Sequence, residues 1–310
     1  MSTGTIYDVI IIGGGPSGIS CALECQDSNL SHLLLEKRRT FGGQLYEVPG
    51  PIPNLPAGNH ASDGGALARQ LMEHALSFKC NLKSNSAVVE ISPDTLTVTT
   101  ESGHAYRAKA IYLATGARYR KPSYENQEQF GNYVHHRHYV DEAYFKNKRV
   151  VIVGGGDSAF YAAMAKAEVA KSVTLMHRSE NFRARTDLVD EIRRDSRIKI
   201  LTNMEIVSLH GDSKLNSCKV RNTETGELTR LDSEVVYTKI GYQPNSELFK
   251  TILRQNKTGH VIVDEKLATS RPGIYAGGDL VKPGFDRITV AFAQGTLAVR
   301  SIREFLEGAN

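Results

Sequence analysis

The sequence predicts an α/β protein with two Rossmann-like units, each a parallel sheet extended by β-meander strands. A short apolar strand, a glycine-rich turn, a helix and a second strand follow one another over residues 7–35, and the same order returns over residues 149–176. Short alternating segments such as 87–91 and 96–99, and a hairpin turn at 222–226, are typical of meander strands. The chain of 310 residues is long enough for two domains.

The first glycine turn has the spacing Gly13-x-Gly15-x-x-Gly18 and lies between the strand 7–12 and a helix expected to reach about Asp27. Gly13 permits the tight turn, Gly15 lets the backbone approach a pyrophosphate, and Gly18 lets helix and strand pack closely. The pyrophosphate then lies at the positive end of the helix. The turn therefore predicts a dinucleotide site.

Glu36 closes the second strand, 32–35, and is placed to accept hydrogen bonds from a ribose. A carboxylate at this point repels a 2′-phosphate. The first site therefore suits FAD or NAD better than NADP.

Three later segments resemble those of the two-dinucleotide flavoprotein superfamily. They are Gly42-Gly43-Gln44, then Ala114-Thr115-Gly116 after the apolar strand 110–113, and the strand from Ile274 that leads to Asp279. The resemblance implies FAD in the first unit, with Asp279 hydrogen-bonded to its ribityl chain. It also implies that an FAD domain of residues 1–118 and 241–310 has a second nucleotide domain, residues 119–240, inserted in it. The residues expected at FAD are Gly13, Gly15, Pro16, Ser17, Gly18, Glu36, Gly43, Gln44, Leu45, Asn54, Ala114, Thr115, Gly116, Asp279, Arg287 and Ile288.

The second glycine turn has the spacing Gly154-x-Gly156-x-x-Ala159, with alanine as the close-packing third residue. It lies between the strand 149–153 and a helix expected to reach about Ala170, and the next expected strand is 172–176. The strand that should end in a carboxylate ends instead in His177-Arg178. A guanidinium here suits a 2′-phosphate, and Arg183 and Arg185 lie just downstream. The alternative is that these arginines belong to a solvated loop. The residues expected at a nicotinamide nucleotide are Gly154, Gly156, Asp157, Ser158, Ala159, His177, Arg178 and Arg183.

From Asp8 to about Phe305 the chain resembles the low-molecular-weight thioredoxin reductases. The matching segments are residues 13–18, 42–45, 54–56, 154–159, 177–178, 182–184, 241–245 and 277–279. The resemblance implies FAD in the first domain, NADPH in the second and a homodimer. One departure is that Ser179 and Glu180 follow Arg178, where the family usually has a second arginine. NADPH is favoured, while NADH or a second flavin nucleotide stays open.

The dithiol of this family is missing from the sequence. The family carries Cys-x-x-Cys-Asp about fourteen residues before the second glycine turn, and this chain has Arg137-His138-Tyr139-Val140-Asp141 there. Candidates near the flavin are His138, Tyr139 and Asp141, and no residue is assigned a catalytic role. The segment 135–139 is interpreted either as an aromatic, basic surface beside the flavin or as a solvated connector. No ligand cluster for a metal is visible.

The four cysteines, Cys21, Cys25, Cys80 and Cys218, form no Cys-x-x-Cys pair. Cys21 and Cys25 lie four apart on the first expected helix and are interpreted as buried small hydrophobes rather than a redox pair. The net charge of +4 excludes neither a solvated surface nor an acidic partner. No apolar run approaches the roughly 18–20 residues of a membrane span. No signal peptide is expected, because the first strand begins at about Tyr7, and the protein is expected in the cytoplasm or as soluble content of an organelle.

The function expected from this pattern is hydride transfer from NADPH to FAD, with onward delivery to a non-dithiol acceptor. The segment 287–295 resembles the ferredoxin/flavodoxin–NADP reductases related to thioredoxin reductase, so the acceptor is expected to be a small redox carrier or a small molecule. Two alternatives stay open: a disulfide reductase that uses a non-standard cysteine or a second flavin, and a non-enzymatic redox-sensing flavoprotein. No nucleic acid or membrane partner is expected.

Overall fold

A computed structural model describes residues 5–48, 50–52, 54–55, 62–136, 141–281 and 287–308. The chain forms two compact units: Met1–Arg118 with Gln243–Asn310, and Tyr119–Tyr242. The chain passes between them at β7 (Ala117–Tyr119) and β16 (Tyr242–Pro244), which form a two-stranded sheet. The predicted second boundary, between residues 240 and 241, lies two residues before the end of the second unit at Tyr242.

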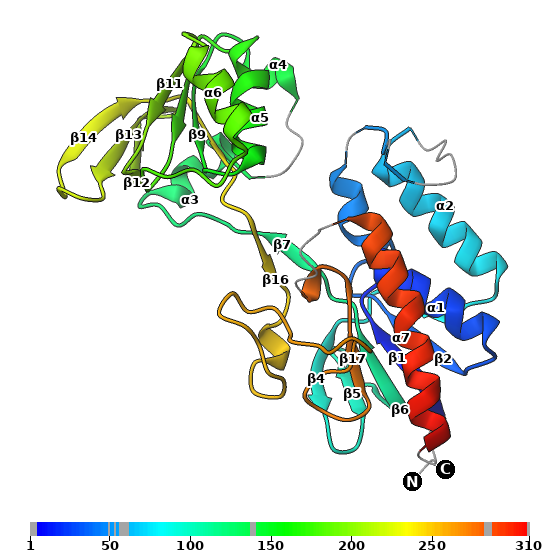
Figure 1. The fold of residues 1–310 in the computed structure, drawn as a ribbon. Coiled ribbons are helices and arrows are strands. Elements are labelled where there is room, and N and C mark those ends of the chain that lie inside the picture. The colour runs from blue at the N-terminus through cyan, green and yellow to red at the C-terminus, as the bar shows by residue number, and fades with distance from the viewer. Residues whose placement is uncertain are drawn as a thin grey trace. The chain divides into compact units, whose positions relative to one another are not determined.

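The first unit contains a seven-stranded sheet in the order β3-β2-β1-β6-β5-β4. The last strand, β17, pairs in parallel with the end of β6, while antiparallel β5 pairs with its beginning. Figure 1 shows helices α1 and α7 lying side by side against this sheet. The strands are β1 (Ile6–Ile12), β2 (His32–Leu35), β3 (Leu82–Lys83), β4 (Val88–Ser92), β5 (Thr97–Thr100), β6 (Ala105–Leu113) and β17 (Ile274–Ala276). The helices are α1 (Pro16–Asp27), η1 (Gly43–Glu47), α2 (Gly64–Ser77), η3 (Glu247–Phe249), η4 (Gly278–Leu280) and α7 (Ile288–Gly308).

Helices α1 and α7 approach closely because a glycine lies between them. A Cβ on Gly295 of α7 would come within 2.3 Å of the Ser17 carbonyl oxygen of α1. Ser20 of α1 also donates a 2.8 Å hydrogen bond to the Phe292 carbonyl. The end of the chain is thereby fixed against its beginning, which brings the last strand and the first glycine turn together.

The second unit contains a five-stranded parallel sheet in the order β11-β10-β9-β15-β8. A separate three-stranded antiparallel sheet, β12-β13-β14, accompanies it, so the meander does not extend the parallel sheet as the sequence suggested. The strands are β8 (Val134–His135), β9 (Arg149–Val153), β10 (Ser172–Met176), β11 (Ile198–Leu201), β12 (Met204–Gly211), β13 (Leu215–Asn222), β14 (Leu228–Asp232) and β15 (Val235–Thr238). The helices are α3 (Gln127–Phe130), η2 (Gly131–Tyr133), α4 (Glu142–Phe145), α5 (Asp157–Ala167) and α6 (Thr186–Arg194).

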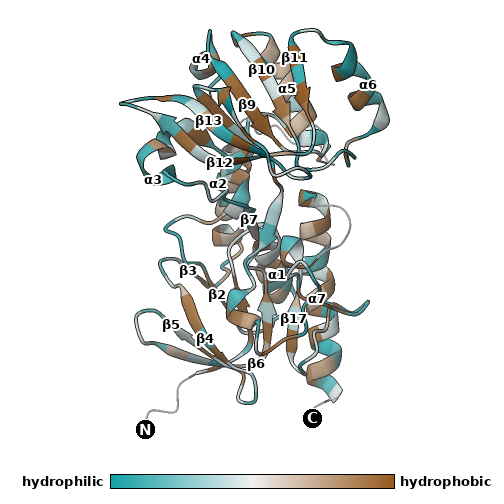
Figure 2. Cartoon of the chain, turned by 90° about the vertical axis from the view of Figure 1, so that its left-hand side faces the viewer, coloured by the Kyte–Doolittle hydropathy of each residue, from teal (hydrophilic) through white to brown (hydrophobic). Residues whose placement is uncertain are grey.

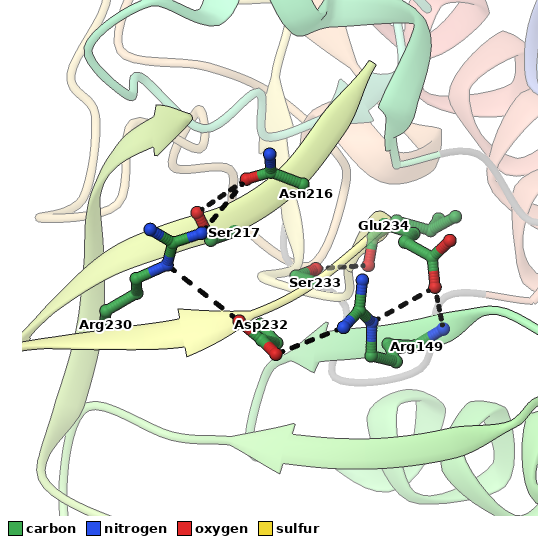
Figure 3. Close-up of polar contacts among 8 residues, drawn as sticks. Arg149, Asn216, Ser217, Arg230, Asp232, Ser233 and Glu234 are labelled. Carbon is green, nitrogen blue, oxygen red and sulfur yellow. Dashed lines mark hydrogen bonds and ion pairs between the residues drawn. The ribbon is translucent and has the colours of Figure 1, made fainter. Parts of the chain in front are cut away.

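The two sheets of the second unit meet through apolar side chains on one face of β12 and β13, among them Leu209, Cys218 and Val220. In Figure 2 the hydrophobic colour runs along strands such as β9, whose central residues are buried. A polar connection adds to this core, because Arg149 at the start of β9 pairs with Asp232 at 3.1 Å and with Glu234 at 3.2 Å (Figure 3). These contacts fix the end of β14 and the start of β15 beside β9.

Candidate functional site

The first glycine turn leaves no room for side chains where it faces the sheet. Gly13 has a φ of 110°, and a Cβ on it would come within 2.3 Å of the Ala114 carbonyl oxygen. A Cβ on Gly18 would come within 1.9 Å of the Gly13 carbonyl oxygen. At Gly15, by contrast, no neighbouring heavy atom of the described residues lies within 4 Å of the Cβ position, and α1 begins at Pro16 directly after it. The turn is therefore open only at the helix N-terminus, which fits a pyrophosphate.

Glu36 is held beside this turn by two backbone groups. Its side chain is 6% exposed and accepts a 2.6 Å hydrogen bond from the Gly14 N–H and a 2.8 Å bond from the Arg38 N–H. Each carboxylate oxygen keeps a second lone pair. Glu36 is therefore fixed in position with acceptor capacity left for ribose hydroxyls.

Asp279 and Gln44 meet at the same edge of the sheet. The Gln44 amide donates a 2.6 Å hydrogen bond to the Asp279 carboxylate. Gly43 approaches Gly15 so closely that a Cβ on it would lie 3.1 Å from the Gly15 Cα, and a Cβ on Gly278 would lie 3.1 Å from the Ser17 Cβ. The structure thus brings the glycine turn together with two segments that lie far from it in the sequence.

The Ala114–Gly116 turn is held by Asn245, a side chain to which the sequence analysis gave no role. Asn245 donates a 2.7 Å hydrogen bond to the Thr115 carbonyl, and the Thr115 hydroxyl donates a 2.8 Å bond to the Asn245 carbonyl. The Asn245 N–H also donates to the Gly116 carbonyl at 2.9 Å. In the sequence, the role of Asn245 was indicated only by its place at the end of segment 241–245, which matches the thioredoxin reductases.

The remaining residues expected at FAD differ in their surroundings. Leu45 is buried in a small cluster that includes Ile288 at the start of α7. Ser17 is buried, with its hydroxyl 2.6 Å from that of Tyr112. Arg287 and Asn54 are exposed. Pro56, also part of the resemblance, lies outside the described residues.

The second glycine turn repeats the geometry of the first. Gly154 has a φ of 158°, and a Cβ on it would come within 2.5 Å of the Lys239 carbonyl oxygen and 2.9 Å of the Ala159 Cβ. Gly156 precedes α5 and is open, since no heavy atom from the described part of the chain lies within 4 Å of its Cβ position. Asp157 accepts a 2.9 Å hydrogen bond from the Arg185 N–H, and Ser158 is exposed. This turn also fits a pyrophosphate.

His177 packs on the second turn. A Cβ on Gly155 would come within 2.3 Å of the His177 ring, which also stacks on Phe182 with a centroid distance of 5.4 Å. The hydroxyl oxygen of Ser179, the residue that departs from the family pattern, lies 3.0 Å from the Nε2 of His177. Burial lowers the pKa of His177, so the ring is uncharged at neutral pH.

The three arginines near His177 fall into two groups. Arg178 and Arg183 are exposed, and neither guanidinium makes a hydrogen bond or ion pair within the described part of the chain. Arg185 pairs with Asp187 at 2.9 Å. The Arg183 N–H donates to the Gly155 carbonyl at 2.7 Å, which holds that residue beside the turn. Arg178 and Arg183 are therefore available to bind a phosphate here.

The segment in register with the family's dithiol is described only at its edges. His138 and Tyr139 lie outside the described residues, as do Arg137 and Val140. Asp141 is exposed, and its carboxylate accepts a 3.0 Å hydrogen bond from the Ala143 N–H. It therefore caps the short helix α4.

All four cysteines are buried and unpaired. Cys21 and Cys25 are 0% exposed and lie in the core under α1, which confirms the interpretation of this pair as small hydrophobes. Burial raises the pKa of Cys21, and raises that of Cys80 to about 11. Buried thiols with raised pKa values are poor nucleophiles.

Within the described residues, no group of three or more His, Cys, Asp or Glu side chains could hold a metal ion. None of the described helices is long and apolar enough to cross a membrane.

Each unit combines parallel strands with an open glycine turn at the start of a helix, an arrangement typical of proteins that bind two dinucleotides. Residues 7–295 match the pyridine nucleotide-disulphide oxidoreductase family model, and the chain belongs to this family. It is therefore an oxidoreductase, and the predicted α/β class and the resemblance to thioredoxin reductases are confirmed.

Relatives match the chain along almost its whole length. It is 34% identical over 302 residues to a thioredoxin reductase of Mycolicibacterium smegmatis, with 96% of each chain covered. It is 33% identical over 304 residues to the 34.2 kDa protein in the rubredoxin operon of Clostridium pasteurianum, with 97% of each covered. The crystal structure of Lactococcus lactis thioredoxin reductase matches with a TM-score of 0.83 and 29% identity, over 97% of this chain and 99% of that one.

Proposed function

We propose that this protein is an FAD-dependent NADPH oxidoreductase that delivers electrons to an acceptor other than a dithiol of its own chain. One observation carries the proposal: a chain that matches thioredoxin reductases over its length has no Cys-x-x-Cys, and its four cysteines are buried. Without a thiolate pair, the usual transfer to a protein disulfide lacks its first acceptor.

The first unit fits FAD. The open turn at Gly15 would receive the pyrophosphate, Glu36 the adenosine ribose, and Asp279, oriented by Gln44, the ribityl chain. When bound, the flavin supplies the electron chemistry, since it exchanges electrons with nicotinamides in pairs and with carriers one at a time. The chain's own contribution to this chemistry is position and hydrogen bonding.

The second unit fits a nicotinamide nucleotide, with the pyrophosphate at Gly156. Arg178 and Arg183 are free to bind a 2′-phosphate, which favours NADPH over NADH. In the first unit, Glu36 occupies the corresponding position and disfavours that phosphate. The two units are therefore matched to different dinucleotides.

For the acceptor we propose a small redox carrier such as ferredoxin or flavodoxin. The resemblance of segment 287–295 to the ferredoxin/flavodoxin–NADP reductases supports this choice. The relative named for a rubredoxin operon also points to small redox proteins. Family resemblance favours a homodimer, which light scattering would test.

The test is anaerobic titration of the purified yellow protein with NADPH and, separately, with NADH, following the visible absorbance of the flavin. We expect NADPH to bleach the flavin at lower concentration than NADH. If the protein binds FAD but neither nucleotide reduces it, the protein would instead be a redox-sensing flavoprotein.

A further inference from the structure

Lys239 lies at the edge of the second unit's sheet where the proposed nucleotide binds, although no motif drew attention to it. It directly follows β15, its N–H donates a 2.7 Å hydrogen bond to the Val153 carbonyl, and its own carbonyl oxygen packs against Gly154. Its backbone therefore forms one wall of the second glycine turn.

Strand order determines which half of a dinucleotide reaches Lys239. In the order β11-β10-β9-β15-β8, the glycine turn follows β9, and His177 and Arg178 follow β10 on one side. A ligand in such a fold lies across the carboxyl ends of the strands, at the point where the strand order reverses. With the adenosine half at β10, the other half extends over β15, toward Lys239.

The Lys239 side chain lies among aromatic rings. Its Nζ is 4.3 Å from the centroid of the Tyr237 ring and 5.9 Å from that of Tyr119. Tyr119 in turn packs on Tyr242 with a centroid distance of 4.5 Å and on His136 at 6.4 Å. A cation beside several rings, at the carboxyl edge of a sheet, is suited to a planar ligand ring.

Charged side chains of α5 and α4 lie near Lys239. The Nζ of Lys166, on α5, lies 5.7 Å from the centroid of the same Tyr237 ring. Lys166 also forms an ion pair with Glu142 of α4. Burial, with a smaller contribution from Lys166, lowers the pKa of Lys239 to about 8. Burial raises the pKa of Tyr237, so that ring is uncharged at the same pH. Lys239 is therefore cationic at neutral pH and loses its charge as the pH rises through about 8.

We propose that the Lys239 ammonium contacts the nicotinamide half of the nucleotide and makes the second site prefer the reduced, uncharged ring to the oxidised, cationic one. The reason is electrostatic, because an ammonium beside a pyridinium repels it at short range in a partly buried site. This inference rests on the proposed function. It adds a residue that discriminates between the two redox states of the donor.

The test compares two ligands that cannot react with the oxidised, FAD-loaded protein. They are NADP⁺ and tetrahydro-NADP, whose partly saturated nicotinamide ring is uncharged and donates no electrons. Calorimetric dissociation constants would be measured between about pH 7 and pH 9, where a phosphate monoester with a pKa near 6 stays ionised. The variants are Lys239→Met, which removes the charge, and Lys239→Arg, which keeps it. Lys219→Met, at an exposed lysine of β13, is the matched control.

We expect the unchanged protein to bind tetrahydro-NADP about tenfold more tightly than NADP⁺ at pH 7, the equivalent of one pKa unit. In the unchanged protein, the ratio of the two dissociation constants should shrink above about pH 8. In Lys239→Met the ratio should be close to one at every pH, and in Lys239→Arg the preference should persist to about pH 9. Lys219→Met should match the unchanged protein.

An equal ratio in Lys239→Met and the unchanged protein would overturn the inference and leave the proposed function intact. If the unchanged protein bound neither ligand, the nicotinamide site itself would be lost, and the role of Lys239 with it. FAD content and melting temperature, unchanged in the variants, would show that the fold is preserved.

Discussion

The side-chain amide of Gln44 donates a 2.6 Å hydrogen bond to the carboxylate of Asp279, 235 residues further along the chain. The contact joins η1, which follows the first strand pair, to η4, which follows the last strand of the sheet. It is one of the side-chain links between the two separate parts of the sequence that build the first dinucleotide site.

Asp279→Ala should therefore weaken FAD binding by about tenfold or more, since a bond to a charged group contributes about 1.5–3 kcal/mol. Gln44→Ala should weaken FAD binding less, because this substitution removes a partner of the Asp279 carboxylate but keeps the carboxylate itself. FAD retained after dialysis measures both effects. Asp94→Ala, at an aspartate whose side chain is 87% exposed, is the control and should keep its flavin.

Glu36→Ala should lower both FAD affinity and the melting temperature of the apoprotein. Two backbone N–H groups, of Gly14 and Arg38, would lose their acceptor, at a cost of about 1–3 kcal/mol each where buried. Glu36→Gln keeps one acceptor oxygen and should lose less stability. Equal melting temperatures for Glu36→Ala and the unchanged apoprotein would contradict this account of the carboxylate.

Replacing both Arg178 and Arg183 by methionine should raise the dissociation constant for NADPH about a hundredfold or more and leave that for NADH nearly unchanged, since each charged hydrogen bond contributes about 1.5–3 kcal/mol. Arg185→Met is the matched control, because Arg185 already pairs with Asp187. If Arg185→Met reduced NADPH binding as strongly as the double variant, the grouping of the three arginines would be wrong.

The double variant Cys21→Ala, Cys25→Ala should keep its NADPH oxidoreductase activity. Both thiols are 0% exposed in the core under α1, so they touch no substrate. We also expect the native protein to resist a thiol reagent, and the unfolded chain to react at all four cysteines. Loss of acceptor reduction in the double variant, with flavin content and melting temperature preserved, would favour a disulfide reductase with a non-standard cysteine.

Glu234→Gln should make the melting temperature less sensitive to acid. The Arg149 N–H and guanidinium hold the pKa of Glu234 below its usual value (Figure 3). A carboxylate with a lowered pKa stabilises the folded protein at pH values above the pKa of the unfolded state, about 4.3. This stabilisation is lost as the pH falls through the lower pKa of the folded state. The melting temperatures of variant and unchanged protein should therefore differ at neutral pH and converge near about pH 3. Glu224→Gln, in the exposed β13–β14 turn, is the control and should follow the unchanged protein.

The parts of the fold with a local signal were predictable from the sequence. Strands β2, β9 and β10 have the bounds that apolar runs and glycine turns predicted. Helix α5 ends at Ala167 rather than near Ala170, because the N–H groups of Val169 and Ala170 both turn back to the Lys166 carbonyl. Apolar composition alone does not indicate where such a turn ends a helix.

The contacts that complete the site were not predictable, because they join segments distant in sequence. Asn245 holds the turn at Thr115, and Gln294 accepts a 2.7 Å hydrogen bond from the Gly278 N–H. The hydrogen bond between Ser179 and His177 is local, but it was not predictable either, because the sequence showed only that an expected arginine was missing. Lys239 also has no motif, and strand order alone brings it beside Gly154.

The most direct test of the central claim is an anaerobic assay with NADPH as donor and either thioredoxin or a small electron carrier as acceptor. We predict rapid reduction of ferredoxin, flavodoxin or rubredoxin and no efficient reduction of thioredoxin. Efficient reduction of thioredoxin by this chain alone would contradict the account.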